Sequence, residues 1–248
     1  MSRVLVWFSC GAASAVAAKM AIEEHGDAVE VVLCDTLASE HTDNRRFLED
    51  CERWFGRRVT IIRSSVYASV DDVFERTRYM SGIAGARCTV EMKKRPREEY
   101  QRPGDLHVFG FTAEERKRAE DFDRRNTSVD TWHVLVERLV TKRACLDAIL
   151  EARIALPAMY SLGFEHNNCI GCVKATSPGY WNRVRRHFPD VFERRSAQSR
   201  TLGVKLARLG SERVFLDTLP ADADAPDDSI ECGVSCQLGF DFMRGEAR

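Results

Sequence analysis

The chain has 248 residues, of which 44% are hydrophobic and 30% are charged, and its formal net charge is −1. This length and apolar content suit one large α/β domain, or a core domain with a smaller appendage. The balanced charge excludes a long-range attraction to nucleic acid, so any basic surface must be local. No apolar run reaches the roughly 18–20 residues that cross a membrane, and no secretory segment opens the chain. We therefore expect a cytoplasmic protein without membrane contact.

Residues 3–8 form an apolar run of strand length, and residues 15–24 have the composition of a helix. The loop between them consists of small residues: Ser9, Cys10, Gly11, Ala12, Ala13 and Ser14. Such a loop suits a phosphate, because backbone N–H groups converge there and the helix dipole favours an anion. A plain turn that uses small residues for packing is the alternative. The loop fits neither the Walker pattern nor the dinucleotide fingerprint.

Strands and helices are predicted to alternate along the next part of the chain. Strands are expected at residues 28–36, 58–64, 105–112 and 131–137, and helices at 42–55, 70–80 and 143–153. This alternation predicts an α/β fold with a doubly wound, mostly parallel, Rossmann-like sheet. Asp35, at the end of the second strand, would face the ligand crevice and contact a ribose or metal-bound phosphate, or else cap the following helix. His133 is expected to be a paired core histidine rather than a ligand.

A short basic helix is predicted to begin near Cys88, with Arg87, Lys93 and Lys94 beside it. The helix dipole and these cations would favour the thiolate of Cys88, and the same cations suit a phosphate or sulfate. A solvated basic helix with an incidental cysteine is the alternative.

Further charges follow the strand that ends at Gly110. Glu115 and Arg118 lie about one turn later, where they would line the crevice at the carboxyl edge of the sheet. A solvated helix surface would have the same composition.

The C-terminal part is predicted to differ from a core of residues 1–176. Residues 177–219 are expected to form a basic helical extension, with helix from 178 to 209 and a short strand within 212–219. Residues 220–248 are expected to be an acidic, flexible linker and a tail with two cysteines. The stretch from Tyr180 to Arg208 interleaves arginines with aromatic residues, which predicts a nucleic-acid surface or an ordinary helix with buried aromatics.

The nine cysteines are not expected to form a disulfide framework in a reducing compartment. Cys169 and Cys172, separated by Ile170 and Gly171, can point both sulfur atoms at one metal centre. Alone, such a pair is half a zinc site, half an iron–sulfur site or a redox dithiol. Three other cysteines have the apolar neighbours of small buried hydrophobic residues: Cys34, Cys51 and Cys145.

Taken in the order in which they occur along the chain, these motifs resemble those of the phosphoadenosine phosphosulfate (PAPS) reductase family, which belongs to the adenine nucleotide α-hydrolase-like superfamily. The matching segments, between about residues 3 and 192, are the loop 9–14, Asp35, Arg87-Cys88-Thr89 with Lys93 and Pro96, Gly110-Phe111 with Glu115 and Arg118, and Cys169-Ile170-Gly171-Cys172. The loop is similar to a PP-loop, which binds the phosphates of ATP or a sulfonucleotide. The resemblance implies these nucleotide contacts: Ser9, Cys10, Gly11, Ala12, Ser14, Asp35, Arg87, Lys93, Gly110, Glu115 and Arg118.

The loop departs from the pattern SGGxDS of ATP pyrophosphatases at two positions. Cys10 stands at the second position, where the pattern has its first glycine, and Ala13 stands where those enzymes have an aspartate. One contact to Mg²⁺ or phosphate is therefore missing, and the participation of Mg²⁺ is left open.

The resemblance also implies a [4Fe–4S] cluster, with zinc as the competing metal. Its implied ligands are Cys88, Cys169, Cys172 and a cysteine of the tail, Cys236 or Cys232. Glu231-Cys232-Gly233 resembles the tail of sulfonucleotide reductases, in which the cysteine attacks the sulfate sulfur. Cys232 is thus the candidate nucleophile with Cys236 as ligand, or both cysteines ligate the cluster.

Three functions remain open at this stage. The first is ATP-dependent sulfur insertion into a nucleic acid or small substrate, with release of pyrophosphate and use of a sulfur donor. The second is reduction of adenylylsulfate (APS) or PAPS, with thioredoxin releasing sulfite. The third is a non-catalytic nucleotide- or nucleic-acid-binding protein with a structural metal. The sequence leaves the oligomeric state open.

Overall fold

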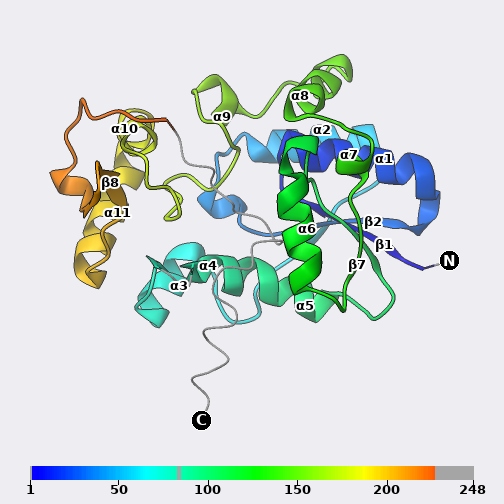
Figure 1. Ribbon diagram of the computed structural model, residues 1–248, viewed down its shortest axis with the longest axis horizontal. Helices are drawn as coiled ribbons and strands as arrows, with labels where there is room; N and C mark the ends of the chain where they lie inside the picture. Colours follow the sequence, from blue (N-terminus) through cyan, green and yellow to red (C-terminus); the bar gives the residue numbers. More distant parts are fainter. Residues whose placement is uncertain (1, 83–84, 227–248) are drawn as a thin grey trace, which may run out of the picture.

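The computed structural model describes residues 2–82 and 85–226. Cys232 and Cys236, the predicted nucleophile and ligand of the tail, lie outside the described residues. At the centre is a five-stranded parallel sheet in the order β3-β2-β1-β6-β7 (Figure 1). Its strands are β1 (Val4–Phe8), β2 (Val29–Cys34), β3 (Thr60–Ile62), β6 (Leu106–Val108) and β7 (Asp130–Trp132).

Helices cover both faces of this sheet, which confirms the predicted doubly wound α/β fold. They are α1 (Ala12–His25), α2 (Asn44–Phe55), α5 (Arg95–Tyr100), α6 (Arg116–Arg125), α7 (Val134–Glu137) and α8 (Lys142–Glu151), with short turns η1 (Gly26–Ala28), η2 (Leu37–Ser39) and η4 (Ala113–Glu115). Successive residues of β1 point to opposite faces. Val4, Val6 and Phe8 pack against α1, α2 and α8, whereas Leu5 and Trp7 pack in the cluster that includes α6.

The strand order reverses at β1. Strands β2 and β6 pair with its two edges, so that Val6 lies opposite both Val31 and Val108. The connections that leave β1 and β6 therefore diverge and open a crevice, which is where ligands bind in open α/β sheets. Gly110 lies at this point, and a Cβ there would come within 2.7 Å of the backbone nitrogen of Ser14. The segment after β6 thus packs directly on the first turn of α1.

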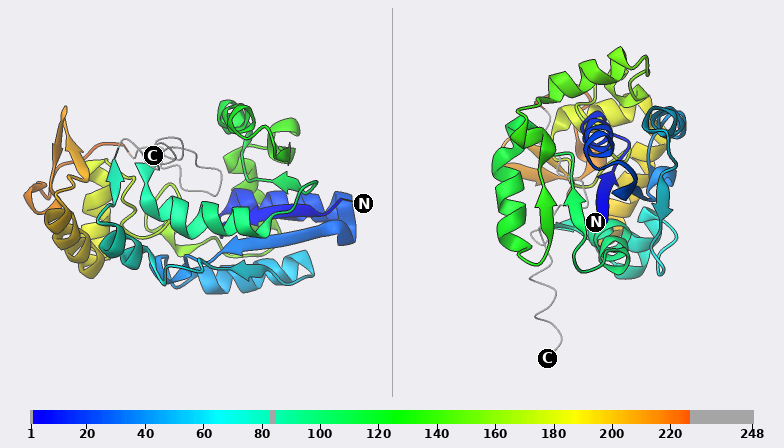
Figure 2. Two further views of the ribbon diagram at one scale, coloured as in Figure 1. Left: turned by 90° about the horizontal axis from the view of Figure 1, so that it is seen from below. Right: turned by 90° about the vertical axis from the view of Figure 1, so that its right-hand side faces the viewer.

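A second apolar core lies beyond the carboxyl ends of the strands, and Figure 2 shows its yellow and gold helices, from residues 178–202, at the end of the molecule opposite the N-terminus. It is built by α3 (Val70–Thr77), α4 (Arg87–Thr89), α9 (Ala158–Ser161), α10 (Pro178–His187) and α11 (Pro189–Leu202). Phe74, Trp181 and Phe192 are among its buried side chains. The predicted extension at 177–219 therefore shares a core with earlier residues, and a domain boundary at residue 176 stays a prediction.

Several predicted boundaries are wrong. The strand expected at 131–137 divides at His133 into β7 and α7, because a short apolar run fits a buried helix as well as a strand. The helix expected through residue 209 ends at Leu202, where Gly203 has a φ of +69°. The helix expected through residue 80 ends at Thr77, before Arg78 with a φ of +55°.

The remaining elements are β4 (Ser81–Gly82) paired with β5 (Gly85–Ala86), β8 (Ala207–Leu209) paired with β9 (Glu212–Val214), and η5 (Leu216–Thr218).

Two other expectations concern single features. His133 Nε2 lies 2.9 Å from both carboxylate oxygens of Asp123, so this ring nitrogen is paired, as predicted. The residue is half-buried rather than in the core, and its Nδ1 has no partner within residues 2–82 and 85–226. In residues 220–226 of the predicted linker, the carbonyls of Pro220 and Ala223 accept hydrogen bonds from Asn182 Nδ2 of α10 at 2.9 and 2.7 Å. The linker stays a prediction. None of the described helices combines the length and apolar character that crossing a membrane requires.

Replacing Gly110 by alanine is expected to lower the melting temperature, because the new Cβ would overlap backbone atoms of Ser14. Overpacking of this kind costs about 1–3 kcal/mol. Thermal unfolding followed by circular dichroism measures the loss. Gly11→Ala is the matched control, since its Cβ would lie 3.7 Å from Ser9 Oγ, an ordinary contact. A loss for Gly110→Ala no larger than that for Gly11→Ala would contradict the close packing.

Candidate functional site

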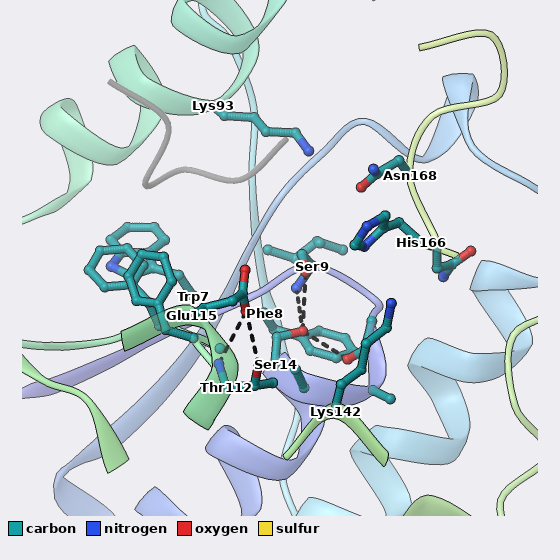
Figure 3. Close-up of a pocket in the computed structure, with 18 of the residues that line it drawn as sticks. Trp7, Phe8, Ser9, Ser14, Lys93, Thr112, Glu115, Lys142, His166 and Asn168 are labelled. Carbon is teal, nitrogen blue, oxygen red and sulfur yellow. Dashed lines mark hydrogen bonds between the residues drawn. The ribbon is translucent and has the colours of Figure 1, made fainter. Parts of the chain in front are cut away.

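A pocket of about 340 Å³ lies in the crevice between β1 and β6 (Figure 3). Its walls come from the loop after β1, the segment after β6, the π-helical turn η3 (Val90–Lys94) and the residues before the CxxC turn. Most of the predicted nucleotide contacts line it: Ser9, Gly11, Ala12, Ser14, Lys93, Gly110, Glu115 and Arg118. The sheet topology thus brings together residues that are far apart in the sequence.

The loop after β1 is folded around the hydroxyl of Ser14. This hydroxyl accepts a hydrogen bond from the Ser9 N–H at 3.1 Å and donates one to the Gly11 carbonyl at 2.9 Å. The single proton of the Ser14 hydroxyl is used in the bond to Gly11. In the contact between the two Oγ atoms at 3.2 Å, the Ser9 hydroxyl is therefore the donor. Gly11 is the N-cap residue of α1 and supplies no side chain to cover the helix end. The first N–H groups of α1 therefore border the pocket and favour an anion.

Cys10 forms the bend of this loop and is the loop residue that does not line the pocket. Its φ of +55° lies in the left-handed region that favours glycine, the residue that the ATP pyrophosphatase pattern has here. The side chain is fully buried, with Sγ 3.9 Å from the Asn44 carbonyl. Burial, together with the charge of Glu40, raises the pKa of the Cys10 thiol well above its ordinary value. The thiol is therefore protonated at neutral pH.

Cationic side chains reach the pocket from separate elements. Lys93 comes from η3, a π-helical turn within the helix that α4 begins and α5 ends, and such turns are frequent at functional sites. Lys142 begins α8, and its Nζ donates to the Glu165 carbonyl at 2.7 Å. Arg118 of α6 pairs with Glu115. Figure 3 shows Lys93 and Lys142 extending into the pocket from opposite sides.

Two carboxylates of the pocket are engaged with the backbone. Glu115 accepts a hydrogen bond from the Thr112 N–H at 3.1 Å and completes the capping box of η4. Glu114 accepts one from the Lys142 N–H at 3.2 Å. These carboxylates therefore hold the segment after β6 in place beside the loop.

Two further predicted contacts, Asp35 and Arg87, do not line the pocket. Asp35 accepts a hydrogen bond from the Leu37 N–H at 3.2 Å and pairs with Arg63 at 2.7 Å. It does not cap the following helix, because the N-cap residue of α2 is Asp43. Arg87 lies 2.8 Å from a carboxylate oxygen of the fully buried Glu91. Asp35 thus joins the residues that follow β2 and β3, whereas Arg87 pairs with a residue one helical turn away.

The structure adds a buried polar network that sequence reasoning missed. Asn167 Nδ2 donates to the Cys10 carbonyl at 2.7 Å and to Asn44 Oδ1 at 2.8 Å. Asn44 Nδ2 donates to Glu40 at 2.8 Å, and the Thr36 hydroxyl donates to the other Glu40 oxygen at 2.6 Å. Only the sequence positions of these residues could have indicated a role near the pocket, since Thr36 and Glu40 follow the second strand and Asn167 precedes the CxxC turn.

Other lining residues were not predicted either: Thr112, Glu114, Lys142, Tyr160, His166 and Asn168. His166 and Asn168 stand together on one wall (Figure 3). Burial, followed by the charge of Lys142, lowers the pKa of His166, so its imidazole is neutral at pH 7. This wall is therefore polar without adding charge.

The CxxC turn continues directly from that wall. Gly171 has a φ of +66°, which lets the backbone fold back between Cys169 and Cys172. The Tyr180 hydroxyl accepts a hydrogen bond from the Cys172 N–H at 2.8 Å and donates one to the Cys169 carbonyl at 3.4 Å. Arg195 Nε donates to the Gly171 carbonyl at 3.2 Å. Protein contacts therefore fix the conformation of the turn.

The predicted metal ligands are brought only partly together. Cys88 packs against the apolar core that contains Cys172. Within the part of the chain that the structure describes, no three His, Cys, Asp or Glu side chains form a group that could hold a metal ion. Cys88, Cys169 and Cys172 therefore do not form a three-ligand group, and the predicted fourth ligand, Cys232 or Cys236, lies outside the described residues. The cluster stays a prediction.

The aromatic residues between Tyr180 and Arg208 face inward. Tyr180, Trp181 and Phe192 are buried in the second core, so these rings are not available to stack on bases. Several basic residues of the stretch are exposed: Arg186, Arg194, Arg200, Lys205 and Arg208. The nucleic-acid surface stays a prediction that rests on these cations.

No family model matches the chain, and no curated protein is similar to it at a significant level. The family resemblance in its motifs therefore stays a prediction.

Tyr180→Phe is expected to destabilise the protein by about 1–3 kcal/mol, because the buried Cys172 N–H would lose its partner. Urea unfolding at equilibrium measures the change. Tyr67→Phe is the matched control, since Tyr67 interacts with Arg76 through its ring face. Equal stability of the two variants would contradict the role given to the Tyr180 hydroxyl.

Proposed function

We propose that the chain is an adenine-nucleotide-dependent enzyme of the PAPS reductase type that transfers sulfur. The observation that carries the proposal is the link between the pocket and the CxxC turn. Asn167 lines the pocket, hydrogen-bonds the Cys10 carbonyl of the loop at 2.7 Å and precedes Cys169 by two residues. A loop suited to phosphate and a pair of thiols thereby belong to one connected unit.

The nucleotide is proposed to bind with its phosphates against the first turn of α1. The N–H groups there and the positive end of the helix dipole suit phosphate oxygens. Lys93 and Lys142 would neutralise the remaining charge from opposite sides of the pocket. The volume of about 340 Å³ lies within the usual range for small-molecule sites.

In the reaction that we favour, ATP adenylates an oxygen atom of an acceptor, a nucleic acid or a small molecule. The bond between the α- and β-phosphates breaks, and pyrophosphate leaves with its electron pair. Lys93 and Lys142 would stabilise the charge that develops on that leaving group. Sulfur from a donor then displaces AMP from the activated carbon. An iron–sulfur cluster, when bound at Cys88, Cys169, Cys172 and the tail, supplies electron transfer or sulfur carriage.

Reduction of APS or PAPS is the competing reaction, because the same pocket chemistry suits either nucleotide. It needs the Cys232 thiolate to attack the sulfate sulfur and a thioredoxin to release sulfite. Incubation with labelled ATP and with labelled sulfonucleotides separates the two. Acceptor-dependent pyrophosphate release supports sulfur insertion, whereas sulfite without pyrophosphate contradicts it. Tight nucleotide binding without either product would favour the non-catalytic alternative.

Lys93→Ala and Lys142→Ala are each expected to weaken nucleotide binding about 10-fold or more, because a charge-assisted hydrogen bond contributes about 1.5–3 kcal/mol. Calorimetric titration of ATP and PAPS into the protein measures the affinity. Lys19→Ala is the control, since Lys19 pairs with Glu23 along α1 and does not line the pocket. Unchanged affinity of both pocket variants for ATP and PAPS would contradict the proposed position of the phosphates.

Anaerobically purified protein is expected to be brown and to contain about four irons per chain, as all-cysteine [4Fe–4S] ligation predicts. Cys172→Ala should abolish the absorption near ~400 nm, whereas Cys145→Ala should retain it, because Cys145 is buried among the helices on the sheet. Colourless protein with stoichiometric zinc would rule out the cluster. We place this chemistry in the cytoplasm, where thiols stay reduced.

A further inference from the structure

One aromatic hydroxyl lies at the end of α1 where the phosphates are proposed to bind. Tyr160 is half-buried and lines the pocket, as does Ala12, the first residue of α1. The Ala12 N–H donates a hydrogen bond to the Tyr160 hydroxyl oxygen. Because both residues line the pocket and are joined through these two atoms, a ligand that approaches the first N–H of α1 also meets the phenol.

The phenol keeps its own proton for a ligand. Burial raises the pKa of Tyr160, and the hydrogen bond from the Ala12 N–H lowers it by less, so the net pKa lies above its ordinary value. The hydroxyl is therefore protonated at neutral pH. The bond from Ala12 uses a lone pair of the oxygen, so the O–H remains a separate donor. No acceptor of this proton is found among residues 2–82 and 85–226.

Contacts from α2 hold the short helix that carries Tyr160. Asp43, the N-cap residue of α2, accepts a hydrogen bond from the Ala158 N–H at 2.9 Å. Arg46 donates to the Leu156 carbonyl at 3.3 Å and binds Asp43 through two hydrogen bonds, at 2.6 and 2.8 Å. This ion pair fixes the start of α9, and with it the wall to which Tyr160 belongs. A donor that is fixed before the ligand arrives loses little conformational entropy on binding.

We propose that Tyr160 contacts the bound nucleotide and donates a hydrogen bond from its hydroxyl to a phosphate oxygen. This inference rests on the proposed function and adds a specificity-determining residue to it. Donors from two elements, the N–H groups of α1 and the phenol of α9, would then converge on the anion. Hydrogen bonds to charged acceptors are the stronger ones, so this contact favours a nucleotide over its nucleoside.

The test compares the unaltered full chain with Tyr160→Phe, which keeps the ring and removes only the hydroxyl. Calorimetric titration measures the dissociation constant for ATP, and competition against ATP measures that for adenosine. Tyr160→Phe is expected to bind ATP about 10-fold more weakly, because a hydrogen bond to a charged group is lost, and to bind adenosine as the unaltered protein does. Tyr67→Phe is the matched control and should change neither affinity, since Tyr67 packs against Arg76 and does not line the pocket.

Three results would overturn the inference. Unchanged ATP affinity in Tyr160→Phe would show that the phenol makes no contact with the phosphates. Tighter ATP binding would show that the phenol blocks the helix end and has to be displaced. An equal loss of affinity for ATP and adenosine would show a role in packing alone. In all three, the unaltered protein still binds ATP, so the proposed function stands. Failure of the unaltered protein to bind both ATP and PAPS would overturn the proposed function and the inference together.

Discussion

The central position of β1 in the parallel sheet determines where the functional residues of this chain meet. The polypeptide builds β2 and β3 on one side of β1 and then returns to add β6 and β7 on the other. The carboxyl ends of β1 and β6 therefore lie side by side while their connections diverge. Gly110 and Ser14 are in backbone contact at this point, where a Cβ on Gly110 would lie 2.7 Å from the Ser14 nitrogen. The helix end and the pocket depend on that contact.

The Asn167 side chain links this crevice to the cysteine turn, as does the hydrogen bond from the Ile170 N–H to the Ser39 carbonyl at 2.9 Å. Asn167 is hydrogen-bonded to Cys10 of the loop and to Asn44 of α2, across 157 and 123 positions of sequence. Two residues later the chain enters the CxxC turn, which Tyr180 and Arg195 hold from the second core. A ligand that orders the loop would act on the turn in part through this buried amide. The arrangement would couple the proposed nucleotide binding to the proposed thiol chemistry.

The sheet and most of the pocket could be predicted from the sequence, because apolar runs of strand length alternate with helical segments and end in small or charged residues. The division of residues 131–137 into a strand and a helix at His133 could not be predicted, because a short run with four apolar residues is compatible with either element. The roles of Glu40, Asn44 and Asn167 depend on contacts across the whole chain, which no local pattern encodes. Asp35 and Arg87 were also predicted to contact the nucleotide, but neither lines the pocket, and they pair with Arg63 and Glu91.

A crystal structure of the chain with a non-hydrolysable ATP analogue tests the central claim most directly. It should place phosphate oxygens within hydrogen-bond distance of the backbone N–H groups at the start of α1, with Lys93 and Lys142 on either side. Phosphates bound at another part of the surface, with the loop of residues 9–14 in no contact with them, would contradict the assignment of this crevice as a nucleotide site.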